Sequence, residues 1–381
     1  MRTKKFAAVA AGIALAFGLA ACAGGGAGGE DTPTGSANPA DQLIGVAMPT
    51  QTSERWIADG KAVKEGLEKA GYQVSLQYAG DDIPTQSQQI DQMITQGADL
   101  LIIAAIDGTA LSGQLETAAS KGIPVIAYDR LIRDSKNVDF YVTFDNYKVG
   151  VQQATSLLVG LGLLKPDGSK GDAKGPFNVE LFAGSLDDNN AHFFWQGAVD
   201  TLQEYIDAGT IVIPSGQTKI EQAAILRWQQ ETAQKRMEDL LTSTYSTGKK
   251  VQGVLSPYDG LSRGIITALQ NAGYGQGDPM PIVTGQDAEI ASVKLINDGV
   301  QFSTIFKDTR KLAEQAVVAS QDFLAGKEPE ANDTKTYDNG VKVVPSYLLQ
   351  SDIVYKDNIQ SLLVDSGYWT ADEVASGQAA G

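Results

Sequence analysis

Residues 99–130, DLLIIAAIDGTALSGQLETAASKGIPVIAYDR, have a strand–helix–strand pattern that indicates the fold class. Two short apolar runs, 99–105 and 124–128, read as buried strands, and longer amphipathic stretches separate most such runs in this chain. Parallel neighbouring strands need a long crossover, which a helix usually supplies. The alternation therefore predicts βαβ units and a mostly parallel sheet.

The same alternation of short apolar runs with amphipathic stretches extends from Leu43 over most of the chain. Residues 54–71 and 86–96 repeat apolar side chains at helical spacing and are predicted helices. The predicted strands are 43–48, 74–79, 99–105, 124–128, 139–144, 178–183, 210–213, 252–256, 281–285 and 302–306. One sheet of that many strands would be wide, so we predict an α/β fold with two doubly wound parallel-sheet lobes.

Breaks in the pattern indicate where the chain passes between the lobes. We expect crossings near Thr143 to Asn146 and near Phe306 to Asp308, and the polar stretch from Glu328 to Gly340 is expected to lead to a third. The predicted boundaries are 43–145 plus 308–343 for the first lobe, 146–307 plus 344–370 for the second lobe, and 371–381 for a C-terminal tail.

The first 42 residues are predicted to export and anchor the protein. Basic residues at positions 2, 4 and 5 precede an apolar run from Phe6 to about Gly18, shorter than the roughly 20 residues that a membrane span needs. Leu19-Ala-Ala-Cys22 resembles the lipobox of bacterial lipoproteins, which predicts a signal peptide over 1–21 and lipidation of Cys22. A secretory peptide with a stray cysteine is the alternative. Residues 22–42, rich in Gly, Ala and Pro, are expected to form a flexible tether.

Composition excludes several classes of function. The 381 residues carry 46 acidic and 30 basic side chains, a net charge of −16, so a phosphate backbone would be repelled and nucleic-acid binding is not expected. Cys22 is the one cysteine and His192 the one histidine, which leaves no material for a disulfide framework, a multi-histidine metal site or a Cys/His nucleophile. No catalytic residue, metal or cofactor is predicted.

Polar side chains follow many of the predicted strands at their carboxyl ends, the edge where open α/β sheets bind ligands. In chain order, these groups are Arg55-Trp56, Asp129-Arg130, Asp187-Asp188-Asn189-Asn190, Tyr258-Asp259, Gln286-Asp287 and Lys307. Asp129, Asp259 or Asp287 could each be only a helix N-cap. Caps alone would not predict the basic residues Arg55, Arg130 and Lys307 at the same edge.

This set of groups suits a sugar. A hydroxyl both donates and accepts hydrogen bonds, so carboxylates, guanidinium groups and amides can saturate adjacent hydroxyls in pairs. The C–H face of a sugar ring needs an aromatic plate, for which Trp56, Phe194, Trp195 and Trp228 are candidates. A site between two lobes can enclose such a ligand by hinge motion.

Longer motifs then resemble the periplasmic aldose-binding proteins, specifically the multiple-sugar-binding receptor and the xylose-binding protein of ATP-driven importers. The resemblance runs from about Leu43 to about Trp369. It is carried by Met48-Pro-Thr, Glu54-Arg-Trp, Tyr128-Asp-Arg-Leu-Ile-Arg, Thr143-Phe-Asp-Asn, Gly184-Ser-Leu-Asp-Asp-Asn-Asn-Ala, Leu226-Arg-Trp, Ser256-Pro-Tyr-Asp-Gly, Gly285-Gln-Asp-Ala and the stretch Asp333 to Pro345.

The resemblance implies a type I periplasmic-binding fold with three hinge crossovers and a monosaccharide such as galactose, glucose, arabinose or xylose held between the lobes. By resemblance, the binding residues are Arg55, Trp56, Asp129, Arg130, Asp188, Asn190, Trp228, Asp287 and Lys307. Tyr258 and Asp259 are predicted with them from their place after the eighth strand. Many relatives carry Asn where this chain has Tyr258, a departure that favours the multiple-sugar branch. Several basic groups converge on the site, so uronic acids stay open as ligands.

The implied function is capture without catalysis. A closed, sugar-loaded form would be handed to the membrane permease of an ABC importer, and Cys22 would hold the monomer at the outer face of the cytoplasmic membrane. A glycosidase using a carboxylate pair such as Asp188 and Asp287 is the alternative. Against it, the basic residues among those acids should keep the carboxylates ionised. The export signal excludes a sugar-responsive transcription regulator of the same fold.

Overall fold

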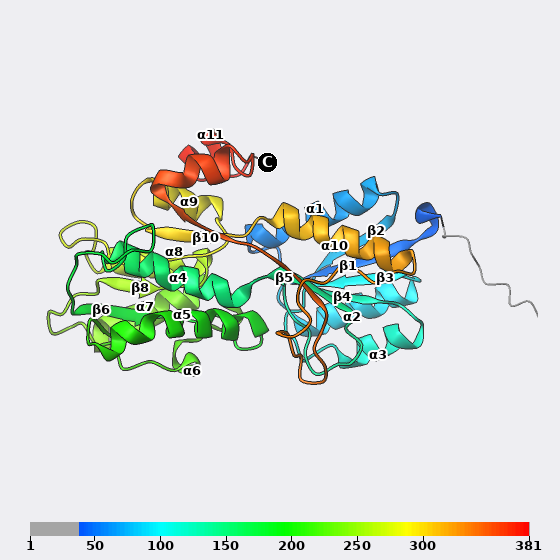
Figure 1. Ribbon diagram of the computed structural model, residues 1–381, viewed down its shortest axis with the longest axis horizontal. Coiled ribbons are helices and arrows are strands. Elements are labelled where there is room, and N and C mark those ends of the chain that lie inside the picture. The colour runs from blue at the N-terminus through cyan, green and yellow to red at the C-terminus, as the bar shows by residue number, and fades with distance from the viewer. Residues whose placement is uncertain (1–37, 381) are drawn as a thin grey trace, which may run out of the picture. The chain divides into compact units, whose positions relative to one another are not determined.

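The computed structural model describes residues 38–380, so the predicted signal peptide and Cys22 lie outside the described residues. The first lobe is built on a six-stranded parallel sheet in the order β11-β5-β4-β3-β1-β2 (Figure 1). Its strands are β1 (Leu43–Met48), β2 (Gln73–Tyr78), β3 (Leu100–Ile103), β4 (Val125–Tyr128), β5 (Phe140–Phe144) and β11 (Ser346–Leu349).

Helices cover both faces of this sheet, and each face has its own core. On one face, Val63 and Leu312 belong to an apolar cluster with the strands, and on the other face Ile90 and Leu115 do the same. The helices are α1 (Glu54–Lys69), α2 (Ile83–Thr95), α3 (Ser112–Ser120) and α10 (Thr309–Leu324). Strands buried on both faces explain the near-continuous apolar runs of the sequence.

The second lobe repeats the plan with shorter strands. Four parallel strands run in the order β7-β6-β8-β9, β10 pairs antiparallel with β12, and a parallel bridge between Gln286 and Ile305 lies beyond the end of β9. The strands are β6 (Phe177–Leu181), β7 (Ile211–Val212), β8 (Gly253–Leu255), β9 (Ile282–Val283), β10 (Ser303–Phe306) and β12 (Asp352–Tyr355).

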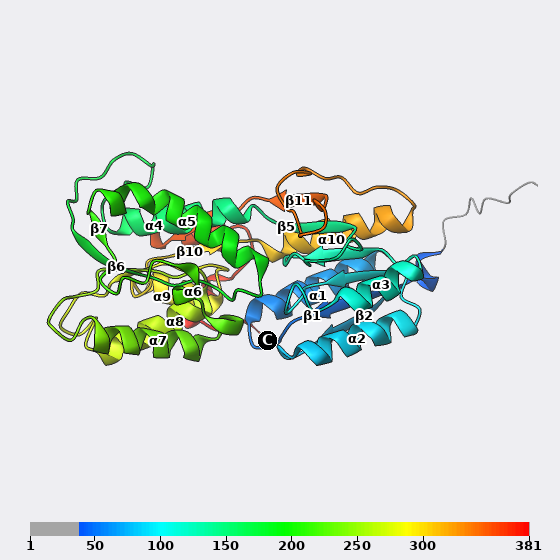
Figure 2. The same ribbon diagram turned by 90° about the horizontal axis from the view of Figure 1, so that it is seen from below.

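The helices of the second lobe also lie on both sides of its strands (Figure 2). They are α4 (Asn146–Gly160), α5 (Asn189–Asp207), α6 (Ile220–Ala223), α7 (Gln230–Ser243), α8 (Asp259–Asn271), α9 (Ile290–Asn297) and α11 (Ala371–Ser376). Short helical turns are η1 (Pro39–Asp41), η2 (Leu226–Trp228), η3 (Lys356–Asn358) and η4 (Gln360–Val364). Among residues 38–380 there is no helix both long and apolar enough to cross a membrane.

Within the described residues the chain passes between the lobes after β5, after β10 and between β11 and β12. The third passage corrects the predicted boundary at 343/344, because β11 pairs with β5 in the first lobe and the crossing lies at 350–351. β11 and β12 are absent from the predicted strands: each has only four residues, and β11 follows a long polar segment. All ten predicted strands have an observed counterpart whose ends lie within two residues.

Two terminal predictions also need correction. The expected tail 371–381 contains α11, which packs on α9 and buries Val374 in an apolar cluster. The expected tether does not extend to residue 42 as a free coil. Residues 39–41 form η1, and Gln73 Nε2 donates a hydrogen bond of 2.8 Å to the carbonyl of Ala40. The folded body therefore begins a few residues earlier than predicted.

Candidate functional site

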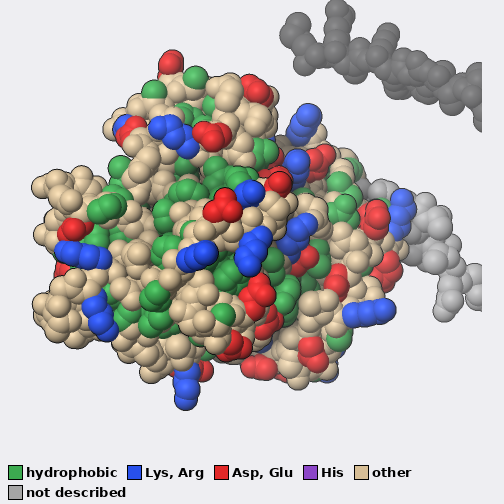
Figure 3. Space-filling model, turned by 60° about the vertical axis from the view of Figure 1, so that its left-hand side comes forward, with side chains coloured by type: hydrophobic (Ala, Val, Ile, Leu, Met, Phe, Trp, Pro, Cys, Tyr) green, Lys and Arg blue, Asp and Glu red, His purple; other side chains and the backbone are tan. Residues whose placement is uncertain are grey.

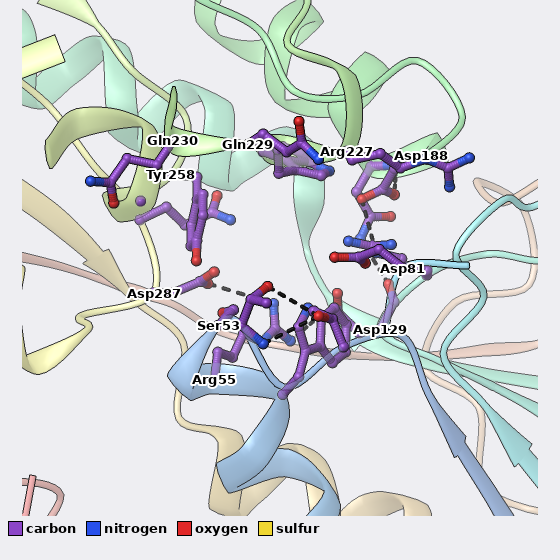
Figure 4. A pocket seen from close by; sticks show the side chains of 18 of the residues that line it. Ser53, Arg55, Asp81, Asp129, Asp188, Arg227, Gln229, Gln230, Tyr258 and Asp287 are labelled. Atoms are coloured by element: carbon purple, nitrogen blue, oxygen red, sulfur yellow. Dashed lines mark hydrogen bonds and ion pairs between the residues drawn. The ribbon is translucent and has the colours of Figure 1, made fainter. Parts of the chain in front are cut away.

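A cavity of about 470 Å³ lies between the lobes, and residues that follow β1, β4, β6, β8, β9 and β10 line it. Ten of the predicted site residues line it: Arg55, Trp56, Asp129, Arg130, Asp188, Asn190, Trp228, Tyr258, Asp287 and Lys307. Figure 4 shows side chains of both lobes pointing toward one another across it. This is the carboxyl edge of both sheets, as the positions of the polar groups predicted.

Arg55 contacts three carboxylates at the floor of the cavity. Its side chain is buried in the first turn of α1, where it pairs with Asp129 and where Nε donates a hydrogen bond of 2.9 Å to Asp59. Its Nη1 lies 3.5 Å from Oδ1 of Asp287 in the second lobe. Burial alone would lower the pKa of Arg55, but these three carboxylates raise it well above its ordinary value. The guanidinium group is therefore a permanent charge joining the two lobes.

Asp129 and Asp59 respond differently to the same arginine. Burial raises the pKa of both, but Arg55 and Lys307 bring the pKa of Asp129 below its usual range, so Asp129 is ionised. Asp59 is fully buried, and its partner Arg55 also contacts Asp129 and Asp287. There burial dominates and raises its pKa to about 6, although Tyr128 Oη also donates to it at 2.5 Å.

Trp56 positions two arginines. The guanidinium carbons of Arg55 and Arg130 lie 4.8 and 5.0 Å from the centroid of its ring, within cation–π range. Arg130 Nε lies 3.2 Å from Oδ2 of Asp188, across the boundary between the lobes. Trp56 thus contacts two basic groups in addition to lining the cavity.

Asp188 and Asn190 enter from the start of α5. Asp188 is the N-cap, accepting a hydrogen bond of 2.9 Å from the Asn190 amide. Burial raises the pKa of Asp188 in spite of Arg130, contrary to our expectation that no acid in the site has a raised pKa. Asn190 is committed mainly to the protein: Nδ2 donates to the Asp129 carbonyl at 2.7 Å, and Oδ1 accepts from Tyr141 and Asn146.

Trp228 forms an aromatic wall of the second lobe. It and Arg227 have φ values of 55° and 56°, the left-handed region that non-glycine residues seldom adopt. Its ring packs edge-on against Phe194 and Tyr258 at 6.3 and 6.1 Å between centroids. A Cβ on Gly184 would lie 2.0 Å from the ring, so glycine is required there. The buried Nε1 has no hydrogen-bond partner among the described residues.

Asp287 and Lys307 complete the cavity near the second crossing. Lys307 is 1% exposed, and its Nζ lies 2.9 Å from Oδ1 of Asp287. The ammonium group also lies 5.5 Å from the ring centroid of Phe194 and 5.7 Å from that of Phe144. A lysine this buried needs such compensation, and the carboxylate with the two rings supplies it.

Asp259 does not belong to the cavity, which corrects its prediction as a ligand residue. It is fully buried, and its oxygens accept hydrogen bonds from Gln301 Nε2 at 2.9 Å, Thr304 Oγ1 at 3.0 Å and the Glu289 amide at 3.0 Å. Both carboxylate oxygens thus accept hydrogen bonds from within the protein. Trp195 likewise packs against the core of the second lobe rather than facing the cavity.

Several further lining residues were not among the predicted binding residues: Thr50, Thr52, Ser53, Asp81, Arg227, Gln229, Gln230, Glu231 and Arg263. Asp81 follows β2 closely, so the strand-end rule could have found it. Gln229 and Gln230 begin α7 next to Trp228, and nothing in the sequence marks that turn as part of the edge. Among residues 38–380, no group of three His, Cys, Asp or Glu side chains is placed to hold a metal ion.

Comparison with known proteins identifies relatives over most of the chain. A family model described as a periplasmic binding protein domain matches residues 44–328. The multiple sugar-binding periplasmic receptor ChvE of Rhizobium radiobacter is 56% identical over 332 residues, covering 87% of this chain and 92% of that protein. The D-xylose-binding periplasmic protein of Escherichia coli is 34% identical over 339 residues, covering 89% and 94%.

A solved structure agrees with these sequence matches. An ABC transporter solute binding protein of Clostridium phytofermentans, crystallised with β-D-glucose, superposes with a TM-score of 0.82 at 46% identity, covering 87% of this chain and 100% of that chain. The predicted fold class and the resemblance are therefore confirmed. With two parallel-sheet lobes around a polar, aromatic-walled cavity, the chain belongs to the periplasmic binding protein family, alongside receptors for multiple sugars and for D-xylose.

Proposed function

We propose that this protein captures a neutral aldose between its lobes and delivers it to an ABC importer, without catalysis. The observation that carries the proposal is the cavity itself. Asp129, Asp287 and Lys307 offer acceptors and a donor on its floor, while Trp228 supplies an aromatic wall. Alternating donors and acceptors beside an apolar ring are what a pyranose needs.

The charge pairing favours a neutral sugar over a uronate. Every basic side chain of the cavity has a carboxylate partner, in the pairs Arg55–Asp129, Arg130–Asp188, Arg227–Asp187, Arg263–Glu289 and Lys307–Asp287. The lining also contains Asp81 and Glu231, for which the described residues show no ion pair. An added carboxylate would therefore meet no spare cation and would be repelled. On the face drawn in Figure 3, acidic and basic side chains are likewise interspersed.

Relatives support transport rather than hydrolysis. The Clostridium relative holding β-D-glucose is a solute binding protein of an ABC transporter, and the Rhizobium relative is a multiple-sugar receptor. Asp188 has the raised pKa of a possible general acid, but it caps α5 and pairs with Arg130. Incubation with an oligosaccharide and assay of reducing ends tests the glycosidase alternative; released ends would refute capture without catalysis.

We further propose that the protein is an exported, lipid-anchored monomer. Leu19-Ala-Ala-Cys22 and the basic start of the chain support export with a lipid on Cys22. Replacing Cys22 with Ser should move the protein from the membrane fraction to the soluble fraction. Retention in the membrane would refute the anchor, and a dimer mass in light scattering would refute the monomer.

Calorimetric titration of the mature chain tests the central proposal. The ligands expected to bind are glucose, galactose, arabinose and xylose. Glucuronate and a free amino acid are titrated for comparison. We expect one or more neutral aldoses to bind and to raise the melting temperature, and glucuronate to bind more weakly at pH 7.5. An amino acid that binds while no aldose does would overturn the function, and tighter glucuronate binding would overturn the neutral-sugar assignment.

A further inference from the structure

Successive residues at the start of α1 reach one loop of the second lobe. Ser53 Oγ donates a hydrogen bond of 2.8 Å to Glu289 Oε1. The Ile290 amide donates a hydrogen bond of 3.2 Å to Glu54 Oε2. The next residue, Arg55, is the one whose Nη1 lies 3.5 Å from Asp287. Residues 53–55 therefore meet residues 287–290 across the boundary between the lobes.

The loop after β9 is held firmly by its own lobe. Asp287 and Ala288 have φ values of 91° and 48°, so two left-handed residues in succession turn the chain sharply. The Ala288 carbonyl accepts from Trp369 Nε1 at 2.8 Å, and the Glu289 amide donates to Asp259 at 3.0 Å. Asp259 thus has a structural task, since it fixes the loop that presents Glu289 to the first lobe.

The Glu289 carboxylate serves both lobes. It is 3% exposed. Oε1 accepts from Tyr258 Oη at 2.7 Å as well as from Ser53, and Oε2 accepts from Arg263 Nη2 at 2.7 Å. Tyr258 and Arg263 belong to the second lobe, as Glu289 does, so a separation of the lobes would leave their bonds in place. Ser53 belongs to the first lobe, so the same separation would break its bond to Glu289.

We infer that Ser53, Glu54, Glu289 and Ile290 form a closure latch, in which Glu289 is a positioning residue that strengthens sugar binding without lining the cavity. The inference rests on the proposed function, because a sugar bound between the lobes adds to the stability of the closed form that the latch already favours in the free protein. Contacts made only in the closed form shift the equilibrium toward that form, and apparent affinity rises with its population. Glu289 also orients Tyr258, a residue of the cavity wall.

A double-mutant cycle with Ser53→Ala and Glu289→Ala tests the latch by titration with glucose. Loss of one hydrogen bond that forms on closure should weaken binding about fivefold for Ser53→Ala. In the Glu289→Ala background the same change should have less than about a twofold effect, because the partner is gone. Equal effects in both backgrounds would overturn the latch and assign Ser53 to direct sugar contact.

Three further variants serve as controls for this test. Ser120→Ala is the matched control, because Ser120 bonds only to Thr117 within α3, and its glucose affinity should equal that of the wild type. Should Glu289→Ala not fold, Ser53→Thr and Ser53→Val replace the cycle: the threonine keeps the hydroxyl and should retain affinity, and the valine should lose it. Equal affinity of the two would overturn the latch.

Small-angle scattering separates failure of the latch from failure of the proposed function. Wild-type protein that binds no aldose would refute the function alone. The latch is then judged on free protein, where Ser53→Val should increase the radius of gyration by opening the lobes. An unchanged radius would overturn the latch. If the wild type binds glucose, Ser53→Val should need a higher glucose concentration to reach the same radius of gyration. An unchanged dependence of the radius on glucose concentration would overturn the latch.

Discussion

Two buried polar clusters of this protein each contain an arginine and at least one acidic side chain, and they have different surroundings. The cavity cluster consists of Arg55, Asp59, Asp129, Asp287 and Lys307. The Glu180 cluster consists of Glu180, Ser215, Arg236 and Tyr245 in the second lobe. The first contributes four side chains to the cavity, and the second contributes none.

The difference lies in where the polar atoms point. Glu180 is fully buried and accepts hydrogen bonds from Ser215 Oγ at 2.6 Å and from Tyr245 Oη at 2.7 Å, so its oxygens are satisfied within the fold. Arg236 stacks on Phe182 at 4.2 Å, and burial lowers its pKa to about 10. In the cavity cluster, Asp287 and Lys307 pair with each other while still facing open space. A buried charge therefore indicates a site only where it borders a cavity.

Asp287→Ala should weaken sugar binding more than any other substitution in the two clusters. It leaves Lys307 buried without its carboxylate and removes a partner of Arg55. We expect sugar affinity to fall about 100-fold, equivalent to roughly 3 kcal/mol. Titration calorimetry measures it, with circular dichroism to show that the variant is folded. A folded variant within twofold of wild-type affinity would contradict the assignment.

Asp59→Asn tests the cavity cluster through the pH dependence of the free energy of unfolding. Because the pKa of Asp59 is raised to about 6 in the folded protein, its proton stabilises the fold below about pH 4, and this contribution is lost as pH rises to about 6. Asparagine does not titrate. Between about pH 4 and 6, the free energy of unfolding of the wild type should therefore fall by up to about 3 kcal/mol relative to that of the variant. Above about pH 6 the two free energies should change in parallel. Urea unfolding from pH 4 to 7.5 measures this, and parallel curves throughout would contradict it.

Glu180→Gln tests whether the Glu180 cluster acts on stability alone. One charge-assisted acceptor is weakened, so we expect the free energy of unfolding to fall by about 1–2 kcal/mol. Glucose affinity should stay at the wild-type value, because the cluster lines no part of the cavity. Chemical denaturation and titration on the same preparation give both numbers. A loss of affinity with unchanged stability would reverse the roles assigned to the two clusters.

Gly184→Ala should have a modest effect on sugar binding, through the cavity wall. Its Cβ would lie 2.0 Å from Trp228, so the indole must move from its place in the cavity wall. We expect sugar binding to weaken about tenfold, near 1.4 kcal/mol. Gly113→Ala is the matched control, because a Cβ there meets no atom within 4 Å. Equal affinities for the two variants would show that the wall does not depend on this contact.

The fold was largely predictable because strands buried on both faces carry continuous apolar runs. The six-stranded sheet was incomplete in the prediction because β11 follows a long polar segment and has four residues. Its pairing with β5 depends on contacts between residues about 200 positions apart in the sequence, as between Ser346 and Tyr141. Local patterns do not contain that information, so the third crossing was placed too early.

For the site, the sequence predicts which loops converge but not which way a side chain turns. Asp129 and Asp259 both follow a strand, and both were predicted to bind the ligand. Asp129 adopts φ 59° and faces Arg55, and Asp259 opens α8 and accepts only from the protein. The choice between them depends on backbone dihedral angles and on neighbours such as Gln301, neither of which has a sequence signal.

The two indoles of the cavity wall have a practical consequence. Of four tryptophans in the chain, Trp56 comes from the first lobe and Trp228 from the second, and both border the cavity. Fluorescence should therefore respond to ligand without any attached dye. Trp56→Phe and Trp228→Phe would assign the emission change to one lobe or the other, so the natural sequence already contains a reporter for each half of the binding event.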